Sequence, residues 1–367
     1  MDRFNALPFA ERKALTDPSF APRQPPKMML PDVVAPSAPA VRVSAGRSRL
    51  LRQVLQLAEF FGDQGRPLTD RGNVKLVDAK TLVGLLGTGD RVDASIGDRV
   101  YKTKGIGDLP QLDYAVELAR RSSALRVVRN KMVAVKAWAK RDEIERASAM
   151  VMAVFEIGAQ GRRRHMNEWF EDLSAFLDAS TPLWLAPNLS TRQPIEVDEI
   201  VLITVAAANM SVGAYRPSFY SDDAAFARLI KEEIEGVLLL VVAAGAVEPR
   251  GDAFTLMPLG RHAMIDVMRG VGYQFDVIGP VDDASARQLL DILKSVDDDQ
   301  IDAVWVDWQS GWTGAEKAKA LVGVLGDAPS VVDRLHTVQL FDRIGVDAEP
   351  SVRTLLHGPM RGTHRCG

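Results

Sequence analysis

The clearest hydrophobic pattern in the chain begins near Asp222, where apolar residues recur every three or four positions. These positions are Phe226, Ile230, Ile234, Val237 and Val241. Residues at this spacing share one face of a helix, which must then pack against another element. Gly245 stands where such a helix would end. The pattern therefore predicts a largely buried helix that begins near Asp222 and stops before Gly245.

Two short apolar segments separated by a turn follow this helix. The segments contain Ala246 with Val247 and Phe254 with Leu256, and the run Pro249-Arg-Gly-Asp252 between them is typical of a turn. A further helical pattern covers about Leu259 to Met268. The whole stretch Asp222–Arg269 thus predicts a helix, a hairpin and a second helix.

Residues 1–46 hold eight of the twenty prolines of the chain. They are Pro8, Pro18, Pro22, Pro25, Pro26, Pro31, Pro36 and Pro39. Such a density opposes regular structure and cannot supply a packed core. We therefore predict a disordered Pro-rich tail over residues 1–46.

The next region, residues 47–140, has helical and extended patterns in a definite order. The first predicted helix is capped by Ser48 and ended by Gly62, and an extended piece follows at Pro67–Thr69. The second helix is capped by Asp78 and ended by Gly87, and a polar loop covers Asp90–Gly107. The third helix runs from Leu109 to about Ser122, with Asp108 placed to accept from its free amides, and a hairpin formed by Leu125–Val128 and Met132–Val135 follows it. This order of helix, strand, helix, helix and hairpin is that of a complete winged-helix domain.

The remainder of the chain is predicted to be mostly helical. Residues 141–270 contain a helical segment, an apolar helix over Val197–Ala208 and the second winged-helix pattern, and residues 271–367 form an acidic region of short helices. Those short helices are Ala284–Val296, Gly314–Leu325, Val331–Ile344 and Ser351–Leu356. The predicted fold class is therefore mainly α with small β wings: two winged-helix modules plus a C-terminal layer of short helices.

Composition narrows the class of protein. The chain is 47% hydrophobic and 25% charged, as is usual for a globular protein with a substantial core. Its single cysteine, Cys366, cannot form an internal disulfide. The longest apolar run, Val237–Val247, is too short to cross a bilayer, and charged residues interrupt the N-terminal apolar runs. We expect a cytoplasmic protein with no membrane partner.

The local distribution of charge says more about possible binding surfaces than the net charge of -3 does. Residues 47–140 contain 18 Lys and Arg against 10 Asp and Glu, whereas residues 281–310 contain 8 acidic against 2 basic residues. In a winged helix the third helix can enter the major groove of DNA while the hairpin contacts phosphate. The candidate nucleic-acid-binding residues on or beside these elements are Lys102, Lys104, Gln111, Tyr114, Arg120, Arg121, Arg126, Arg129, Lys131 and Lys136.

Two readings of this basic surface remain open. Asp113 and Glu117 on the third helix oppose phosphate, so the surface is either a contact for duplex DNA or a solvated basic face. In the second module, Arg250 stands between Glu248 and Asp252, which favours a packed structural or interaction module. The main functional prediction is a non-enzymatic DNA-binding or transcription-associated protein. The alternative is a protein interaction scaffold whose acidic C-terminal region binds a partner.

Other clusters give no chemical signature. The basic run Arg162–His165 is interpreted as a surface cluster. His357, His364 and Cys366 do not have the spacing of a zinc site, and no glycine run has the form of a phosphate-binding loop. No motif places a nucleophile beside a base. We therefore expect no catalytic residue, no metal and no cofactor.

Several runs resemble sequences of known winged-helix proteins. These are Gly65-Arg-Pro-Leu-Thr-Asp-Arg-Gly72, Leu76-Val-Asp-Ala79, Leu85-Leu-Gly-Thr-Gly-Asp90, Leu109-Pro110 and the Val128–Trp138 hairpin. Together they are similar to a segment of largely uncharacterised actinobacterial winged-helix proteins. The run Leu256-Met-Pro-Leu-Gly260 resembles the junction after the wing in many bacterial winged-helix regulators, with Met257 in place of the usual Thr. The resemblance implies a winged-helix fold and favours DNA binding, and it supplies no enzymatic activity and no catalytic residue.

Overall fold

The computed structural model describes residues 28–158, 171–191, 193–211, 222–325 and 330–357. Helix accounts for 63% and strand for 11%, so the predicted mainly α class with small sheets is confirmed. The chain divides into two compact units. Unit 1 includes Ala38–Leu189 and Gln193–Tyr273, and unit 2 includes Met29–Ser37 and Gln274–Gly367. The boundary predicted at 140/141 falls within unit 1.

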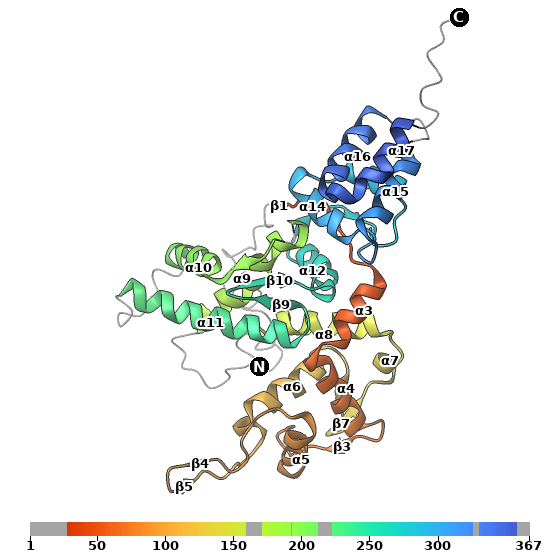
Figure 1. The fold of residues 1–367 in the computed structure, drawn as a ribbon. Helices are drawn as coiled ribbons and strands as arrows, with labels where there is room; N and C mark the ends of the chain where they lie inside the picture. The colour runs from red at the N-terminus through yellow and green to blue at the C-terminus, as the bar shows by residue number, and fades with distance from the viewer. Residues whose placement is uncertain (1–27, 159–170, 192, 212–221, 326–329, 358–367) are drawn as a thin grey trace, which may run out of the picture. The chain divides into compact units, whose positions relative to one another are not determined.

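The first part of unit 1 contains a small sheet among helices (Figure 1). Its elements are α3 (Ala38–Gly46), α4 (Arg49–Phe61), β3 (Arg66–Pro67), α5 (Leu76–Leu86), β4 (Ser95–Ile96), β5 (Arg99–Val100), η1 (Ile106–Asp108), α6 (Pro110–Arg121), β6 (Leu125–Val128), β7 (Lys131–Ala134), α7 (Lys136–Ala139) and α8 (Glu143–Ile157). The sheet order is β3-β7-β6, all antiparallel. Helices α4, α5, α6 and α8 pack together beside it.

The core of this part comes from the apolar periodicity of its helices. Leu57 of α4, Leu82 of α5, Leu118 of α6 and Met150 of α8 are fully buried. Ser48 caps α4 as predicted, because its hydroxyl accepts a hydrogen bond from the Leu51 amide at 3.0 Å. Burial of these side chains removes apolar area from water and holds the four helices in place.

Glycine is required at the start of β3. Gly65 has φ +68°, and a Cβ there would lie 2.7 Å from the Met132 carbonyl oxygen of β7. Only glycine allows this positive φ together with so close an approach to the neighbouring strand. This requirement explains the first residue of the Gly65–Gly72 run.

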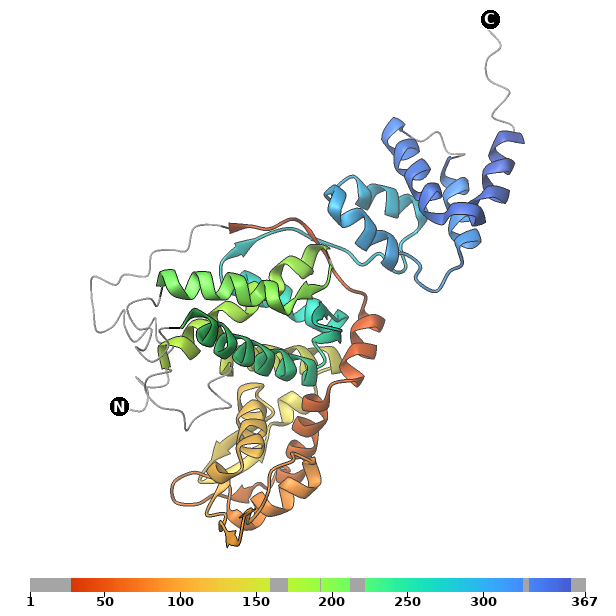
Figure 2. The same ribbon diagram turned by 60° about the vertical axis from the view of Figure 1, so that its left-hand side comes forward.

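The second part of unit 1 repeats the same order of elements. They are α9 (Glu171–Thr191), β8 (Ile195–Glu196), α10 (Val197–Ser211), α11 (Asp223–Ala243), β9 (Val247–Arg250), β10 (Ala253–Leu256) and α12 (Pro258–Gly270). The sheet order is β8-β10-β9, so the strand between α9 and α10 pairs with the last strand of the hairpin, as β3 does with β7. Figure 2 shows α10 and α11 side by side, and these two helices pack against each other. The helix, hairpin and helix predicted over Asp222–Arg269 are confirmed.

The turn from β10 into α12 also depends on a glycine. The Met257 amide donates to the Ala246 carbonyl at 2.9 Å, and a Cβ on Gly260 would clash with the same carbonyl. The first turn of α12 therefore lies directly on the end of α11 and the start of β9. This contact is the physical reason for glycine in the Leu256–Gly260 run.

Two predicted helix caps were wrong. Helix α5 begins at Leu76, and Asp78 is buried inside it with an oxygen 2.9 Å from Arg66 Nη1. Asp108 accepts from the Lys104 amide instead of the α6 amides. The first amides of α6 are capped by Asp90 instead. Its carboxylate accepts hydrogen bonds from the backbone amides of Gln111 at 3.1 Å and Leu112 at 2.8 Å. The long loop folds back on α6, so the capping carboxylate is remote in sequence.

Unit 2 has its own core. Its elements are β2 (Val33–Val34), β12 (Val277–Ile278), α13 (Ala286–Leu293), α14 (Asp298–Asp307), α15 (Gly314–Leu325), α16 (Val331–Ile344), η5 (Gly345–Ala348) and α17 (Glu349–His357). Two further short strands, β1 (Met28–Met29) and β11 (Tyr273–Gln274), pair with each other. Trp308 is fully buried among Leu289, Leu290, Leu321 and other apolar residues. Its indole nitrogen donates to the Ala284 carbonyl at 2.7 Å. Helix α14 was not predicted.

The predicted tail was wrong over its last part. Residues 38–46 form α3, and Val33 of β2 is fully buried in parallel pairing with Val277. The prolines do not prevent this helix, because Pro39 stands in its first turn, where a missing N–H costs nothing. Val41 and Ala45 then bury themselves against α8 and α12. Residues 1–27 lie outside the described residues.

Candidate nucleic-acid interface

The β6–β7 hairpin presents three cations to solvent. Arg126 on β6, Arg129 in the turn and Lys131 on β7 are all exposed. Within the described parts of the chain, no carboxylate forms an ion pair with any of the three. Three unpaired positive charges within six residues produce a local positive potential that an anion can enter without breaking an existing ion pair.

The turn of this hairpin has an unusual backbone. Val128 pairs with Lys131, so Arg129 and Asn130 alone form the loop, with φ of 49° and 58°. Positive φ at both central residues is the type I′ geometry that matches strand twist, and Asn and Gly are the residues that favour it. Arginine has no such preference and carries the steric cost of its Cβ. The tip of the hairpin therefore carries a charged side chain at some cost to stability.

The hairpin is connected to a loop of mixed charge. The Leu68 amide donates to the Asn130 carbonyl at 2.9 Å, and the chain then forms the 69–73 loop. Arg71 of this loop and Lys104 line one hollow of about 530 Å³, together with Asp70 and Asp108. Arg71 was not among the predicted residues, because nothing in its local sequence shows that its loop begins at the hairpin tip.

The third helix, α6, is less suited to base contacts than predicted. Tyr114 is only 3% exposed, so its ring belongs to the core and cannot contact a base; its inclusion was wrong. Arg120 and Arg121 both pair with Glu117, at 3.1 and 3.2 Å. Gln111 is half-buried, and its backbone N–H donates to the Asp90 carboxylate. The exposed side of α6 is thus close to charge-neutral.

The remaining predicted cations are dispersed. Lys136 lies 3.1 Å from the Asp63 carboxylate, in an exposed pair. Lys102 is exposed beside Asp93, whose pKa is lowered first by a hydrogen bond from the Thr103 amide and then by Lys80, with a smaller contribution from Lys102. These residues do not extend the group of hairpin cations formed by Arg126, Arg129 and Lys131.

The second hairpin differs in charge. Arg250 on β9 lies 3.8 Å from Glu248, and Arg47 lies 3.9 Å from the same residue. The β9–β10 hairpin therefore has its cations paired, in contrast to β6–β7. The basic run Arg162–His165 lies outside the described residues, as do His364 and Cys366.

Comparison with known proteins adds no identification, since no family model, no curated protein and no solved structure matches the chain. Across the ranges that the structure describes, no cluster of His, Cys, Asp and Glu is arranged to hold a metal ion. Within the same ranges, no helix combines the length and apolar character that crossing a bilayer would need.

Proposed function

We propose that unit 1 contains two winged-helix modules and that the first of them binds duplex DNA through its hairpin. The protein acts in this proposal as a DNA-binding or transcription-associated factor without enzymatic activity. The second module, with its paired cations and long apolar helix, serves as a packing module. The repeated order of helices and the matching strand orders β3-β7-β6 and β8-β10-β9 support the assignment of two related modules.

One observation carries the proposal: Arg126, Arg129 and Lys131 are exposed on one hairpin without carboxylate partners in the described chain. Phosphate contacts need such unpaired cations, because an arginine already bound to a carboxylate must lose that pair first. The neutral surface of α6 indicates that contacts to the DNA backbone dominate over base readout. Modest sequence specificity is therefore expected.

The test is a fluorescence polarisation titration with duplex DNA over a series of salt concentrations. Binding should weaken as salt rises, because each phosphate contact releases counterions. Replacing Arg126, Arg129 and Lys131 together by Ala should lower the affinity and make the slope of log K against log salt shallower by up to about 2.7, which corresponds to three contacts.

A control variant removes two positive charges elsewhere. Arg47 and Arg250 both pair with Glu248 beside the second hairpin, so the double variant Arg47→Ala/Arg250→Ala should leave the salt slope unchanged. No binding at low salt, or equal slopes for the wild-type protein and the triple variant, would refute the proposed interface.

The alternative function, a protein interaction scaffold, is supported by a different observation in unit 2. Helix α16 exposes several aliphatic side chains, which is unusual for a surface helix without a partner. This surface leads to a separate and more specific proposal.

A further inference from the structure

Helix α16 of unit 2 exposes a group of aliphatic side chains to solvent. Its exposed aliphatic residues are Val331 at 74%, Val332 at 47%, Leu335 at 58% and Val338 at 63%. Positions 331, 335 and 338 have the spacing of one helix face, and Val332 borders it. We name these four residues the outer stripe of α16. Its area is contiguous, unlike the single exposed apolar residues found on most protein surfaces.

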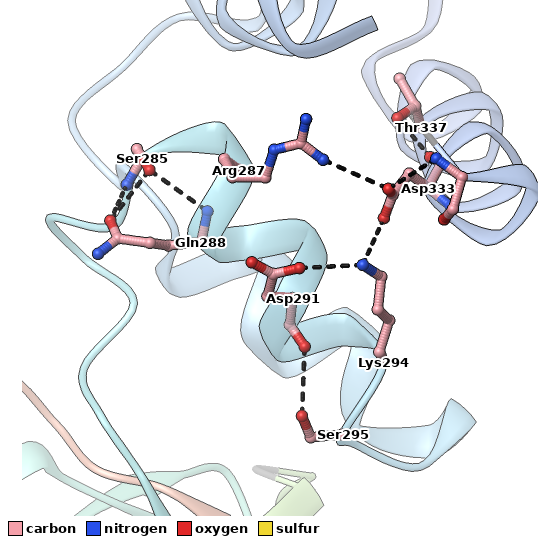
Figure 3. Close-up of polar contacts among 9 residues, drawn as sticks. Ser285, Arg287, Gln288, Asp291, Lys294, Ser295, Asp333 and Thr337 are labelled. Atoms are coloured by element: carbon pink, nitrogen blue, oxygen red, sulfur yellow. Dashed lines mark hydrogen bonds and ion pairs between the residues drawn. The ribbon is translucent and has the colours of Figure 1, made fainter. Parts of the chain in front are cut away.

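The opposite face of α16 explains this orientation. It buries Asp333, Thr337 and Leu340, so two of its inward residues are polar. Figure 3 shows how α13 satisfies the carboxylate of Asp333: Lys294 Nζ lies 2.7 Å from one oxygen and Arg287 Nη1 lies 3.3 Å from the other. The hydroxyl of Thr337 donates to the Asp333 carbonyl at 2.7 Å.

These ion pairs determine the rotation of the helix about its axis. The hydrogen bond from Lys294, opposed by burial and supported by those from Ser330, lowers the pKa of Asp333 to about 2. Turning the outer stripe inward would break the ion pairs of Asp333 with Arg287 and Lys294 and would expose Leu340, which is fully buried. The outer stripe therefore stays at the surface as long as α13 and α16 are in contact.

Two charged residues flank Val338 of the outer stripe, one four residues before it and the other four residues after it. Arg334 and Asp342 are both exposed, and neither has an ion pair with any described residue. They are separated by two turns of α16, about 12 Å along the helix axis. Val338 stands midway between them. A helix with this arrangement is complementary in charge to an antiparallel copy of itself.

We propose that the outer stripe of α16 is a self-association surface: α16 of a second copy packs on it antiparallel, about a two-fold axis near Val338. Arg334 of each copy then lies level with Asp342 of the other, which forms two equivalent ion pairs. Leu335 and Val338 of both copies meet between these pairs and lose their contact with water. Such an isologous contact closes as a dimer and leaves no surface for further growth.

The dimer is expected to be weak. One helix from each copy gives an interface at the small end of the range for specific complexes, so Kd should be on the order of tens of micromolar. Sedimentation of the full chain from about 5 to about 500 µM, a range that spans this Kd, should show the mass rising from monomer to dimer.

Leu335→Glu should raise Kd by at least about tenfold, because it places a charge at the centre of the apolar contact. Leu335 is exposed, so the monomer should keep its fold, which circular dichroism can verify. The matched control is Val306→Glu, which changes a valine of α14 that is 65% exposed and should leave Kd unaltered.

The charges provide a sharper test. Arg334→Asp and Asp342→Arg should each weaken association by roughly tenfold, since each creates two like-charge contacts. The double variant R334D/D342R should recover association, and an equimolar mixture of the two single variants should form a mixed dimer. A wild-type protein that stays monomeric across the range would overturn the proposal. So would a dimer insensitive to Leu335→Glu, or charge variants that do not rescue each other.

Discussion

At the scale of single residues, the most informative position is Arg129. A residue with positive φ that is neither Gly nor Asn is uncommon, and when it carries an exposed charge at a hairpin tip it points to a use for that charge. The adjacent Asn130 occupies the same backbone region without comparable strain. The two turn residues therefore differ in what replacement by glycine should do.

Arg129→Gly should stabilise the protein by about 0.5–1 kcal/mol and weaken DNA binding. Stability rises because glycine adopts φ 49° without a Cβ clash, although its greater freedom in the unfolded chain offsets part of the gain. Thermal unfolding and polarisation titrations of the same samples give both quantities. Asn130→Gly is the control and should change neither by much. A destabilised Arg129→Gly variant would show that the side chain supports the fold instead.

At the scale of elements, unit 2 joins two helices through a buried carboxylate. The Asp333 pKa lies at about 2, below its ordinary value of 3.8, so the folded state favours the ionised form. A carboxyl group with a depressed pKa contributes stability that is fully present above about pH 4 and is lost as the pH falls through about 2. The contact between α13 and α16 should therefore be acid-labile.

Wild-type unit 2 should accordingly lose stability between about pH 4 and pH 2. Tryptophan fluorescence includes a contribution from this unit, since three of the six tryptophans, Trp305, Trp308 and Trp312, lie together in it. Asp333→Asn should be less stable at neutral pH by about 1–3 kcal/mol and should lose less on acidification, because it has no carboxylate to protonate. An equal acid loss in the wild-type protein and the variant would contradict this assignment.

At the scale of the whole molecule, the two proposed surfaces lie in different compact units. The basic hairpin belongs to unit 1, and Asp333 with the outer stripe belongs to unit 2. Effects of substitutions that share no contacts are usually additive. The proposed DNA interface and the proposed self-association surface can therefore be tested independently.

Asp333→Asn should leave the affinity for a short duplex, of about one helical turn, unchanged. Such a duplex offers space for one hairpin, so self-association does not contribute to its binding. Conversely, replacing Arg126, Arg129 and Lys131 by Ala should leave the acid unfolding of unit 2 unaltered. Polarisation gives the DNA affinity of Asp333→Asn, and fluorescence gives the acid unfolding of the triple hairpin variant. A change of more than about twofold in the DNA affinity of Asp333→Asn would show coupling between the units.

The sequence by itself determined most of the helices and both hairpins. Helical periodicity and turn residues are local properties, so α4, α11, α12 and α16 were predictable within a few residues. The candidate cations of the β6–β7 hairpin were also identified in this way. Where local signals were weak or misleading, the prediction was wrong: the proline-rich segment that contains α3 and the acidic segment that forms α14 are examples.

Only the tertiary structure decided which face of each element is used. Tyr114 is a surface candidate in sequence but is buried, and the cap of α6 comes from Asp90, which lies 20 residues before the helix starts at Pro110. In α16, periodicity alone would place Leu335 in the core and Asp333 outside. The reverse is found, because Arg287 of α13 and Lys294, which directly follows α13, compensate the buried charge. Such pairing depends on residues that are distant in the chain, and a local pattern carries no information about it.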